Sequence, residues 1–218
     1  MTVKAVLFDL DGTLLDTAPD FEVVLNQLRQ EEGLGPIDAD KVRQTVSNGA
    51  RALVELGFDI KEGEPGFEDL RLRLLALYEQ HLAVATKPFP GIEQLLSFCK
   101  ENNLAWGIAT NKPEQYTTPL VRALQLQPDC VICPDHVSER KPHPESMTLG
   151  ASIIGCQTDE IVYVGDHIRD IQCGNRANCT TIAVRYGYID EADDINAWQA
   201  DYIVDQADDI SPIIEKLL

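Results

Sequence analysis

Short apolar runs alternate with helix-like segments through most of this 218-residue chain. The first run, at residues 3–8, is nearly continuous in apolar side chains, which is typical of a strand buried on both faces of a parallel sheet. Further strands are expected at residues 104–110, 130–133, 160–165, 180–184 and 202–204, and helices at 92–103, 117–126, 144–154, 170–177 and from 210. This alternation, with its short connections, predicts an α/β fold with a doubly wound parallel sheet.

Four helical patterns in a row interrupt the alternation near the start of the chain. They cover residues 18–32, 38–46, 51–57 and 67–82, and no segment between residues 17 and 85 has the pattern of a strand. Such a run of helices predicts a small separate insert. The expected division is an α/β core at residues 1–16 and 86–218 and a helical insert at 17–85, with the Pro-Phe-Pro-Gly segment at 88–91 as a stiff hinge.

The charge balance restricts the partners of the chain. Its net charge is −18, from 36 acidic and 18 basic residues, so neither nucleic acid nor an anionic membrane is expected as its main partner. An anionic substrate would need local cations to offset this field. The start of the chain enters the first strand directly and no apolar run could span a bilayer, so a cytoplasmic protein is expected. The six cysteines, including the Cys130–Cys133 pair, are expected as reduced, mostly buried thiols.

Two carboxylates end the first apolar run. Asp9 and Asp11 are separated by Leu10, and side chains two residues apart in extended chain point the same way. Gly12 permits a sharp turn after them, and Thr13 adds a hydroxyl and a backbone N–H. Two adjacent acids favour a hard divalent cation such as Mg²⁺, which binds carboxylate oxygens and substrate phosphate. A polar turn without a metal would account for the same residues.

Other polar residues follow later strands of the predicted sheet. Thr110, Asn111 and Lys112 follow the second strand, Asp166 and Asp170 follow the fourth, and Lys141 precedes a helix. Each has an ordinary structural explanation, as a strand end, a turn, a helix cap or a surface lysine. Functional sites in open parallel sheets form at the carboxyl ends of the strands, however. The sequence therefore predicts that these groups gather at one site.

These motifs, in this order, resemble those of the haloacid dehalogenase superfamily, in particular its phosphoglycolate-phosphatase-like members with an α-helical cap. The segment Asp-Leu-Asp-Gly-Thr at 9–13 is similar to the first motif, Thr110-Asn111 to the second, and Lys141 in Lys-Pro-His-Pro to the third. Gly165-Asp166 with Asp170 is similar to the fourth. His167 departs from the pattern, because relatives commonly carry a small or acidic residue there.

The resemblance implies roles for the acids. Asp9 would be the nucleophile that forms an aspartyl-phosphate. Asp11 would protonate the leaving oxygen and then activate water. Mg²⁺ would be held by the Asp9 carboxylate, the Asp11 backbone carbonyl and Asp166, while Asp170 would support the metal's waters or Lys141.

It also implies groups that bind the substrate. Thr110 and the backbone N–H of Asn111 would bind the phosphoryl oxygens, with Thr13 nearby and Lys141 neutralising charge. Arg51 lies in the insert, where such caps carry a substrate-specificity loop, and is expected to face the site. The segment at 185–188 either closes the rim of the pocket or has a structural role.

The resulting prediction is a Mg²⁺-dependent phosphatase that acts on a small phosphorylated metabolite. Two substrates are open: 2-phosphoglycolate, and N-acetylmuramic acid 6-phosphate, since segments 133–137 and 185–189 resemble bacterial cell-wall-recycling phosphatases. The alternatives are a phosphosugar mutase of the same fold and a non-catalytic, receiver-like phospho-acceptor module. Either a monomer or a homodimer is compatible with the sequence.

Overall fold

A six-stranded parallel sheet forms the centre of the molecule in the computed structural model, which describes residues 2–190 and 192–218. Its strands are β1 (Ala5–Phe8), β4 (Ala105–Ala109), β5 (Cys130–Ile132), β6 (Ile161–Gly165), β7 (Thr180–Val184) and β8 (Tyr202–Val204). Their order is β5-β4-β1-β6-β7-β8, and every neighbouring pair is parallel. The predicted doubly wound α/β fold is confirmed, including the strand at 202–204.

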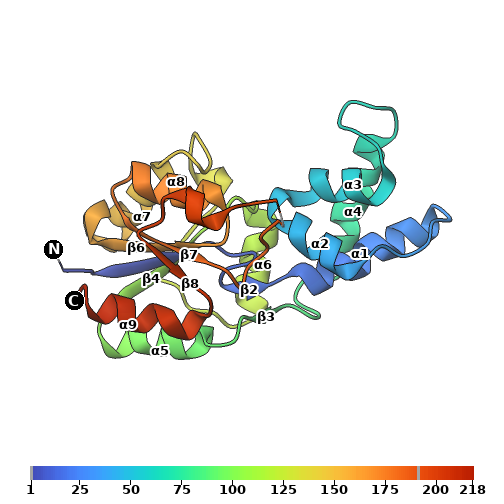
Figure 1. Ribbon diagram of the computed structural model, residues 1–218. Helices are drawn as coiled ribbons and strands as arrows, with labels where there is room; N and C mark the ends of the chain where they lie inside the picture. The colour runs from blue at the N-terminus through green and yellow to red at the C-terminus, as the bar shows by residue number, and fades with distance from the viewer. Residues whose placement is uncertain (1, 191) are drawn as a thin grey trace.

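Helices cover both faces of this sheet. In Figure 1, α7 (Glu145–Ile154) and α8 (Ile168–Arg176) lie above it, and α5 (Ile92–Glu101) and α9 (Ile210–Glu215) lie below it. Accordingly, alternate residues of β1 belong to two different core clusters, Leu7 with Met147 of α7 and Phe8 with Ile92 of α5. All four residues of β1 are buried, because both of its faces are covered.

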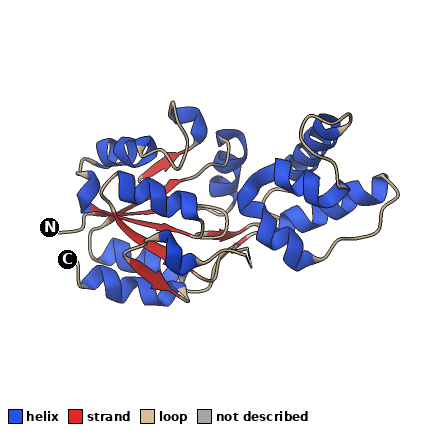
Figure 2. Ribbon diagram, turned by 45° about the horizontal axis from the view of Figure 1, so that its top comes forward, coloured by secondary structure: helices blue, strands red, loops and turns tan. Residues whose placement is uncertain are grey.

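A bundle of four helices lies beyond the carboxyl ends of the strands. These helices are α1 (Ala18–Glu31), α2 (Ala39–Thr45), α3 (Gly49–Phe58) and α4 (Phe67–Gln80). Figures 1 and 2 show the bundle set apart from the sheet, and β1 runs from the N-terminus towards it. Residues 17–85, all of which the structure describes, contain no strand. The division into two folding units at residues 17 and 85 remains a prediction.

The two segments that join the bundle to the sheet pair with each other. They form a two-stranded antiparallel ribbon of β2 (Leu15–Asp16) and β3 (Lys87–Pro88). Residues 88–91, which overlap β3 at Pro88, were expected only as a hinge. Strands of two residues are too short to produce an alternating pattern, so sequence periodicity does not reveal them.

Helix α6 (Glu114–Ala123) differs from its predicted range of 117–126. It begins three residues earlier, directly after Pro113, and it ends before Gln125, whose φ of 54° is left-handed. The N–H of Leu126 then donates to the carbonyl of Val121, a bond that closes the helix end. Glycine is the usual residue at such a position, so a glutamine gave no signal that the helix stops.

The six cysteines are all buried and free, as predicted for reduced thiols. Among the residues that the structure describes, no helix has the length and apolar character needed to cross a membrane.

Candidate active site

Three neighbouring strands bring the predicted site residues to one end of the sheet. β1 lies between β4 and β6, so the residues that follow these strands are adjacent although they are far apart in sequence. Asp9 follows β1, Thr110 follows β4 and Asp166 follows β6. The expected gathering of these side chains at the carboxyl ends of the strands is therefore present in the structure.

Lys141 forms the centre of a buried ionic network. Its ammonium donates to Oδ1 of Asp9 and to Oδ1 of Asp170, each at 2.7 Å, and to the carbonyl of Ala109 at 2.8 Å. The hydroxyl of Tyr163 also lies 2.8 Å from it. Burial alone would lower the pKa of Lys141, but Asp170 and Asp9 outweigh it and raise this pKa. Lys141 is therefore a fixed positive charge beside Asp9.

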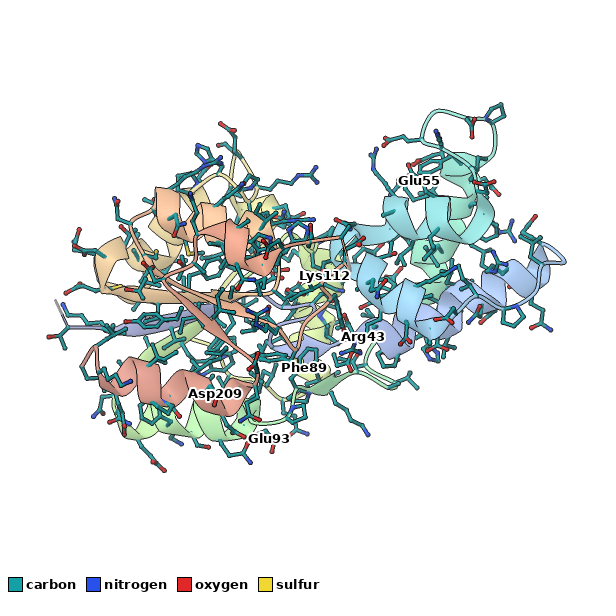
Figure 3. All side chains as sticks on the ribbon, in the orientation of Figure 1. Arg43, Glu55, Phe89, Glu93, Lys112 and Asp209 are labelled. Carbon is teal, nitrogen blue, oxygen red and sulfur yellow. The ribbon has the colours of Figure 1, made fainter. Side chains whose placement is uncertain are left out.

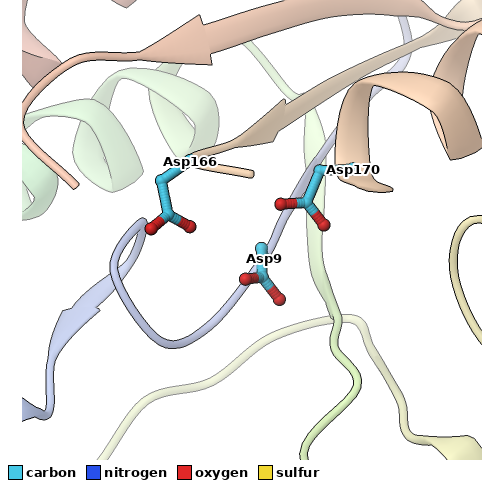
Figure 4. A group of neighbouring side chains, drawn as sticks. All are labelled: Asp9, Asp166 and Asp170. Carbon is cyan, nitrogen blue, oxygen red and sulfur yellow. The ribbon is translucent and has the colours of Figure 1, made fainter. Parts of the chain in front are cut away.

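Three carboxylates lie close enough together to share a cation. Asp9, Asp166 and Asp170 each offer an oxygen within 4.8 Å of the others, and all three are buried (Figure 4). Burial raises the pKa of Asp9 to about 6, and it raises the pKa of Asp166 to about 8 with further contributions from Asp9 and Asp170. One lysine does not neutralise three acids. A hard divalent cation with oxygen ligands fits this deficit of positive charge.

Asp166 is held by groups from several parts of the chain. The Thr13 hydroxyl donates to its Oδ1 at 3.0 Å, and the Tyr188 N–H and the Ser47 hydroxyl donate to its Oδ2 at 2.8 and 3.2 Å. Thr13 is fully buried, and neither it nor Asp166 lines the cavity between the strand ends and the helical bundle. The Thr13 side chain thus orients an acid in the structure, and the substrate-binding role expected from the sequence remains a prediction.

Asp11 belongs to a different pair of contacts. Its Oδ1 accepts hydrogen bonds from the Thr17 hydroxyl at 2.6 Å and from the Lys112 ammonium at 2.9 Å. Its carboxylate is not part of the three-acid cluster. The metal contact expected from the Asp11 backbone carbonyl remains a prediction. Lys112 was expected at this end of the sheet without a role of its own.

The second motif connects two loops of the site. The Thr110 hydroxyl accepts a hydrogen bond from the Lys112 N–H at 3.1 Å. The Asn111 side chain donates to the carbonyl of Lys141 at 3.0 Å and accepts from its N–H at 3.1 Å. The amide of Asn111 therefore fixes the Lys141 loop. Within the described residues its backbone N–H donates to no protein group, which leaves it available to a ligand.

The segment after β7 supports the site from the side. Tyr188 donates its hydroxyl to Oδ1 of Asp16 at 2.7 Å, in addition to its N–H contact with Asp166. The hydroxyl of Tyr186 donates to the Thr13 carbonyl at 3.0 Å. A Cβ at Gly187 would lie 2.2 Å from Cβ of Asp166, so a side chain there has no room. These contacts give the 185–188 segment a structural role.

His167 begins helix α8 as its cap. Its Nδ1 accepts a hydrogen bond from the Arg169 N–H at 3.2 Å, and the Arg169 guanidinium also donates to Oδ1 of Asn48 in the bundle at 2.9 Å. Burial, together with Arg169, lowers the pKa of His167 to about 4, so the imidazole is neutral at neutral pH. The departure from the family pattern thus supplies a helix cap rather than another charge.

A cavity of about 820 Å³ lies between the strand ends and the helical bundle. Asp9 and Asp11 line it from the sheet, and residues of α3 and α4 line it from the bundle. Arg51 is one of the lining residues, where it forms an ion pair with Glu62 and its side chain is 58% exposed.

The cavity is rich in positive charge for so acidic a chain. Among the described residues, its cationic lining side chains are Arg51, Arg71, Lys112, Arg140, Lys141 and Arg169. Four acids, Asp9, Asp11, Glu62 and Asp170, line the same cavity, so the described lining carries two more positive than negative charges in a chain with a net charge of −18. Local charge at contact distance acts more strongly than the screened field of the whole protein, so the cavity suits an anionic ligand.

Comparisons with known proteins agree with this arrangement. Residues 6–184 match the family model for haloacid dehalogenase-like hydrolases. The chain is 41% identical over 220 residues to N-acetylmuramic acid 6-phosphate phosphatase of Pseudomonas aeruginosa, which covers 100% of this chain and 97% of that protein. It is 38% identical over 205 residues to phosphoglycolate phosphatase of Xanthomonas campestris, which covers 93% of this chain and 92% of that protein.

A solved structure shares the whole architecture. The crystal structure of a predicted phosphoglycolate phosphatase from Haemophilus somnus has a TM-score of 0.86 and 25% sequence identity, and the match covers 98% of each chain. Metal dependence is general among haloacid dehalogenase-like hydrolases, and the cluster of Asp9, Asp166 and Asp170 could bind such a metal. Fold, motif order and sequence identity lead to one conclusion: the chain belongs to the haloacid dehalogenase-like hydrolase family.

Proposed function

We propose that the protein is a Mg²⁺-dependent phosphomonoesterase that acts through an aspartyl-phosphate on Asp9. The observation that carries this proposal is the position of Asp9 at the cavity, with Lys141 2.7 Å from one of its oxygens. An ionised, oriented carboxylate next to a fixed cation is suited to attack an anionic phosphoryl group.

The proposed metal ligands are the carboxylates of Asp9 and Asp166 and the backbone carbonyl of Asp11. When bound, Mg²⁺ would offset the negative charge of the phosphoryl group and of the acids around it. Asp170 would hold Lys141, which it contacts at 2.7 Å. The buried three-acid cluster and the raised pKa of Asp166 support this assignment, because such a cluster lacks compensating charge.

In the first step, a carboxylate oxygen of Asp9 forms a bond to phosphorus while the bond from phosphorus to the leaving oxygen breaks. Asp11 gives its proton to that leaving oxygen, so the product departs as an alcohol. In the second step, Asp11 takes a proton from water as the water oxygen attacks phosphorus. The acyl-phosphate bond then breaks, which releases inorganic phosphate and restores Asp9.

The remaining site residues would bind and enclose the substrate. The Thr110 hydroxyl, the Asn111 N–H and Lys141 would contact phosphoryl oxygens during transfer. The helices at residues 17–85 would act as a cap that limits access of water, with Arg51 as a specificity residue. The reaction would take place in the cytoplasm on a small phosphorylated metabolite, by a monomer or a homodimer.

N-acetylmuramic acid 6-phosphate is the substrate that we infer. Support comes from 41% identity to two Pseudomonas phosphatases named for this compound, each matched over the whole of this chain. The cavity volume of about 820 Å³ suits a sugar phosphate better than a two-carbon acid. The second candidate is 2-phosphoglycolate, favoured by 38% identity to phosphoglycolate phosphatases over 93% of the chain.

Phosphate release from both compounds, and from a panel of other phosphorylated metabolites, tests the proposal. N-acetylmuramic acid 6-phosphate should give the highest kcat/KM, Mg²⁺ should be required, and EDTA should stop turnover. A better result with 2-phosphoglycolate would overturn the substrate assignment. Isomerised sugar phosphate without phosphate release would indicate a mutase, and a single equivalent of bound phosphate would indicate an acceptor module.

A further inference from the structure

Lys112 is a second buried lysine at the cavity, and the steps above do not use it. Its side chain is 6% exposed. Its ammonium donates to Oδ1 of Asp11 at 2.9 Å and to the hydroxyl of Tyr78 at 2.8 Å. Asp11 follows β1, whereas Tyr78 belongs to α4 of the helical bundle, and Lys112 lies between these two parts of the molecule (Figure 3).

Two aromatic rings of the bundle hold the Lys112 ammonium. Phe21 of α1 and Tyr78 are stacked, with centroids 3.9 Å apart and planes inclined by 8°. The ammonium lies 5.0 Å from the centroid of Phe21 and 4.7 Å from that of Tyr78. Cations at such distances are attracted to the faces of aromatic rings. The position of Lys112 therefore depends on the packing of the bundle.

The backbone of Lys112 is fixed by the core. Its N–H donates to the Thr110 hydroxyl at 3.1 Å, and its carbonyl accepts a hydrogen bond from the Thr117 hydroxyl at 3.1 Å. A rigid turn thus carries the Lys112 ammonium to Asp11.

The two oxygens of Asp11 have different surroundings. Oδ1 accepts from both Thr17 and Lys112, at 2.6 and 2.9 Å. Oδ2 accepts no hydrogen bond from any residue of 2–190 or 192–218, although Asp11 lines the cavity. With one oxygen held by two donors, the carboxylate cannot rotate freely, and the other oxygen is left for a ligand.

We propose that Lys112 is a positioning residue for Asp11, and that Tyr78 holds Lys112 in place. Lys112 fixes Oδ1 so that Oδ2 is presented to the leaving oxygen of the substrate. This inference rests on the proposed function, in which Asp11 transfers the proton. It gives the helical bundle a part in proton transfer in addition to substrate selection, because the aromatic pair that holds Lys112 belongs to it.

Leaving groups of different acidity provide the test. Phenol is a poor leaving group that needs a proton in the transition state, whereas 2,4-dinitrophenol departs readily as an anion. We would measure kcat/KM for phenyl phosphate and for 2,4-dinitrophenyl phosphate. For Lys112→Met, the loss with phenyl phosphate should exceed the loss with the dinitrophenyl ester at least about 10-fold. Tyr78→Phe keeps the stacked ring and removes only the hydroxyl. Its loss of kcat/KM with phenyl phosphate should also exceed its loss with the dinitrophenyl ester, but by a smaller factor.

The controls are Lys100→Met and Tyr202→Phe, at exposed positions of α5 and β8, which should leave both rates unchanged. Equal losses with the two esters in Lys112→Met would overturn the inference, since a general anion-binding or structural role predicts them. If Lys112→Met does not fold, Tyr78→Phe provides the test, by the same comparison of its losses of kcat/KM with the two esters. Asp11→Asn tests the proton-transfer role of Asp11 separately from the role of Lys112. If Asp11→Asn loses kcat/KM equally with the two esters, the role proposed for Asp11 fails. If Asp11→Asn loses more with phenyl phosphate but Lys112→Met does not, only the inference about Lys112 fails.

Discussion

The ammonium of Lys141 lies 2.7 Å from Oδ1 of Asp9, and both side chains are buried. A second contact of the same length joins this ammonium to Asp170. Removal of one partner from a buried ion pair leaves the other charge without compensation, which is more costly than loss of an exposed pair. Lys141 should therefore be needed both for the stability of the site and for its chemistry.

Replacement of Lys141 tests this double role. In Lys141→Met, Asp9 and Asp170 lose their shared cation, so the free energy of unfolding should fall by about 3–5 kcal/mol. Turnover should fall by a factor of at least about 100, since the transferring phosphoryl group loses a fixed charge. Urea denaturation and kcat/KM measure the two effects, with Lys216→Met as the surface control. Wild-type stability in Lys141→Met would contradict the ion-pair assignment.

The acids of the cluster predict how stability depends on pH in metal-free protein. The pKa of Asp9 is raised to about 6 and that of Asp166 to about 8 in the folded state, both above the usual value for aspartate. A group with a raised pKa binds its proton more tightly when folded. The stability that it contributes is therefore present at about pH 4 and is lost as the pH rises through about 6 to 8.

Mg²⁺ should reverse this loss, because it replaces the protons as the compensating charge. We expect the melting temperature of metal-free protein to be lower at pH 8 than at pH 5. Saturating Mg²⁺ should raise it by at least about 2–4 °C at pH 8 and by less at pH 5. The variant Asp166→Asn should weaken both effects. An equal response to Mg²⁺ at the two pH values would contradict the assignment of the cluster as the metal site.

Arg43 links the bundle to the sheet. Its Nη1 lies 2.9 Å from both carboxylate oxygens of Asp16, its guanidinium carbon lies 4.9 Å from the ring centroid of Tyr188, and Figure 3 shows it close to Phe89 at the junction. In Arg43→Lys the planar guanidinium that lies over the Tyr188 ring is lost. The pair is partly exposed, so the loss of stability should be no more than about 1 kcal/mol, but kcat/KM should fall several-fold if this contact sets the position of the bundle. Unchanged kcat/KM would show that the contact is only structural.

Arg51 lines the cavity although its charge is paired with Glu62. If it recognises the substrate, Arg51→Ala should lower kcat/KM for N-acetylmuramic acid 6-phosphate by about 10-fold or more and should affect para-nitrophenyl phosphate much less. Arg122, which lies on α6 and does not line the cavity, provides the matched control. Equal losses on both substrates would remove Arg51 from the specificity loop.

Much of the fold could be predicted because the sheet is buried on both faces. Apolar runs such as residues 161–165 mark such strands directly, and the acids after them identify the end at which the site forms. The ribbon of β2 and β3 was missed because two-residue strands have no periodicity. The early end of α6 was missed because Gln125, rather than glycine, adopts the left-handed conformation.

The contacts of Lys112 could not be predicted for a different reason. Its place after the second predicted strand puts Lys112 at the site end of the sheet, but a lysine in a polar turn is most often exposed, and nothing near it in sequence identifies its partners. Its partners Asp11 and Tyr78 are 101 and 34 residues away, and only the packing of the bundle against the strand ends brings them together. The contact of Thr13 with Asp166 could not be predicted for the same reason, because the two residues are 153 positions apart in sequence.

Chemical trapping of the acyl-phosphate tests the central claim most directly. The Asp11→Asn variant, incubated with Mg²⁺ and 2,4-dinitrophenyl phosphate, whose leaving group needs no proton, and quenched with borohydride, should carry homoserine in place of aspartate at residue 9, as read by peptide mass spectrometry. Asp9→Asn should carry no such modification and should show no turnover. Homoserine at another aspartate, or continued phosphate release by Asp9→Asn, would contradict the account.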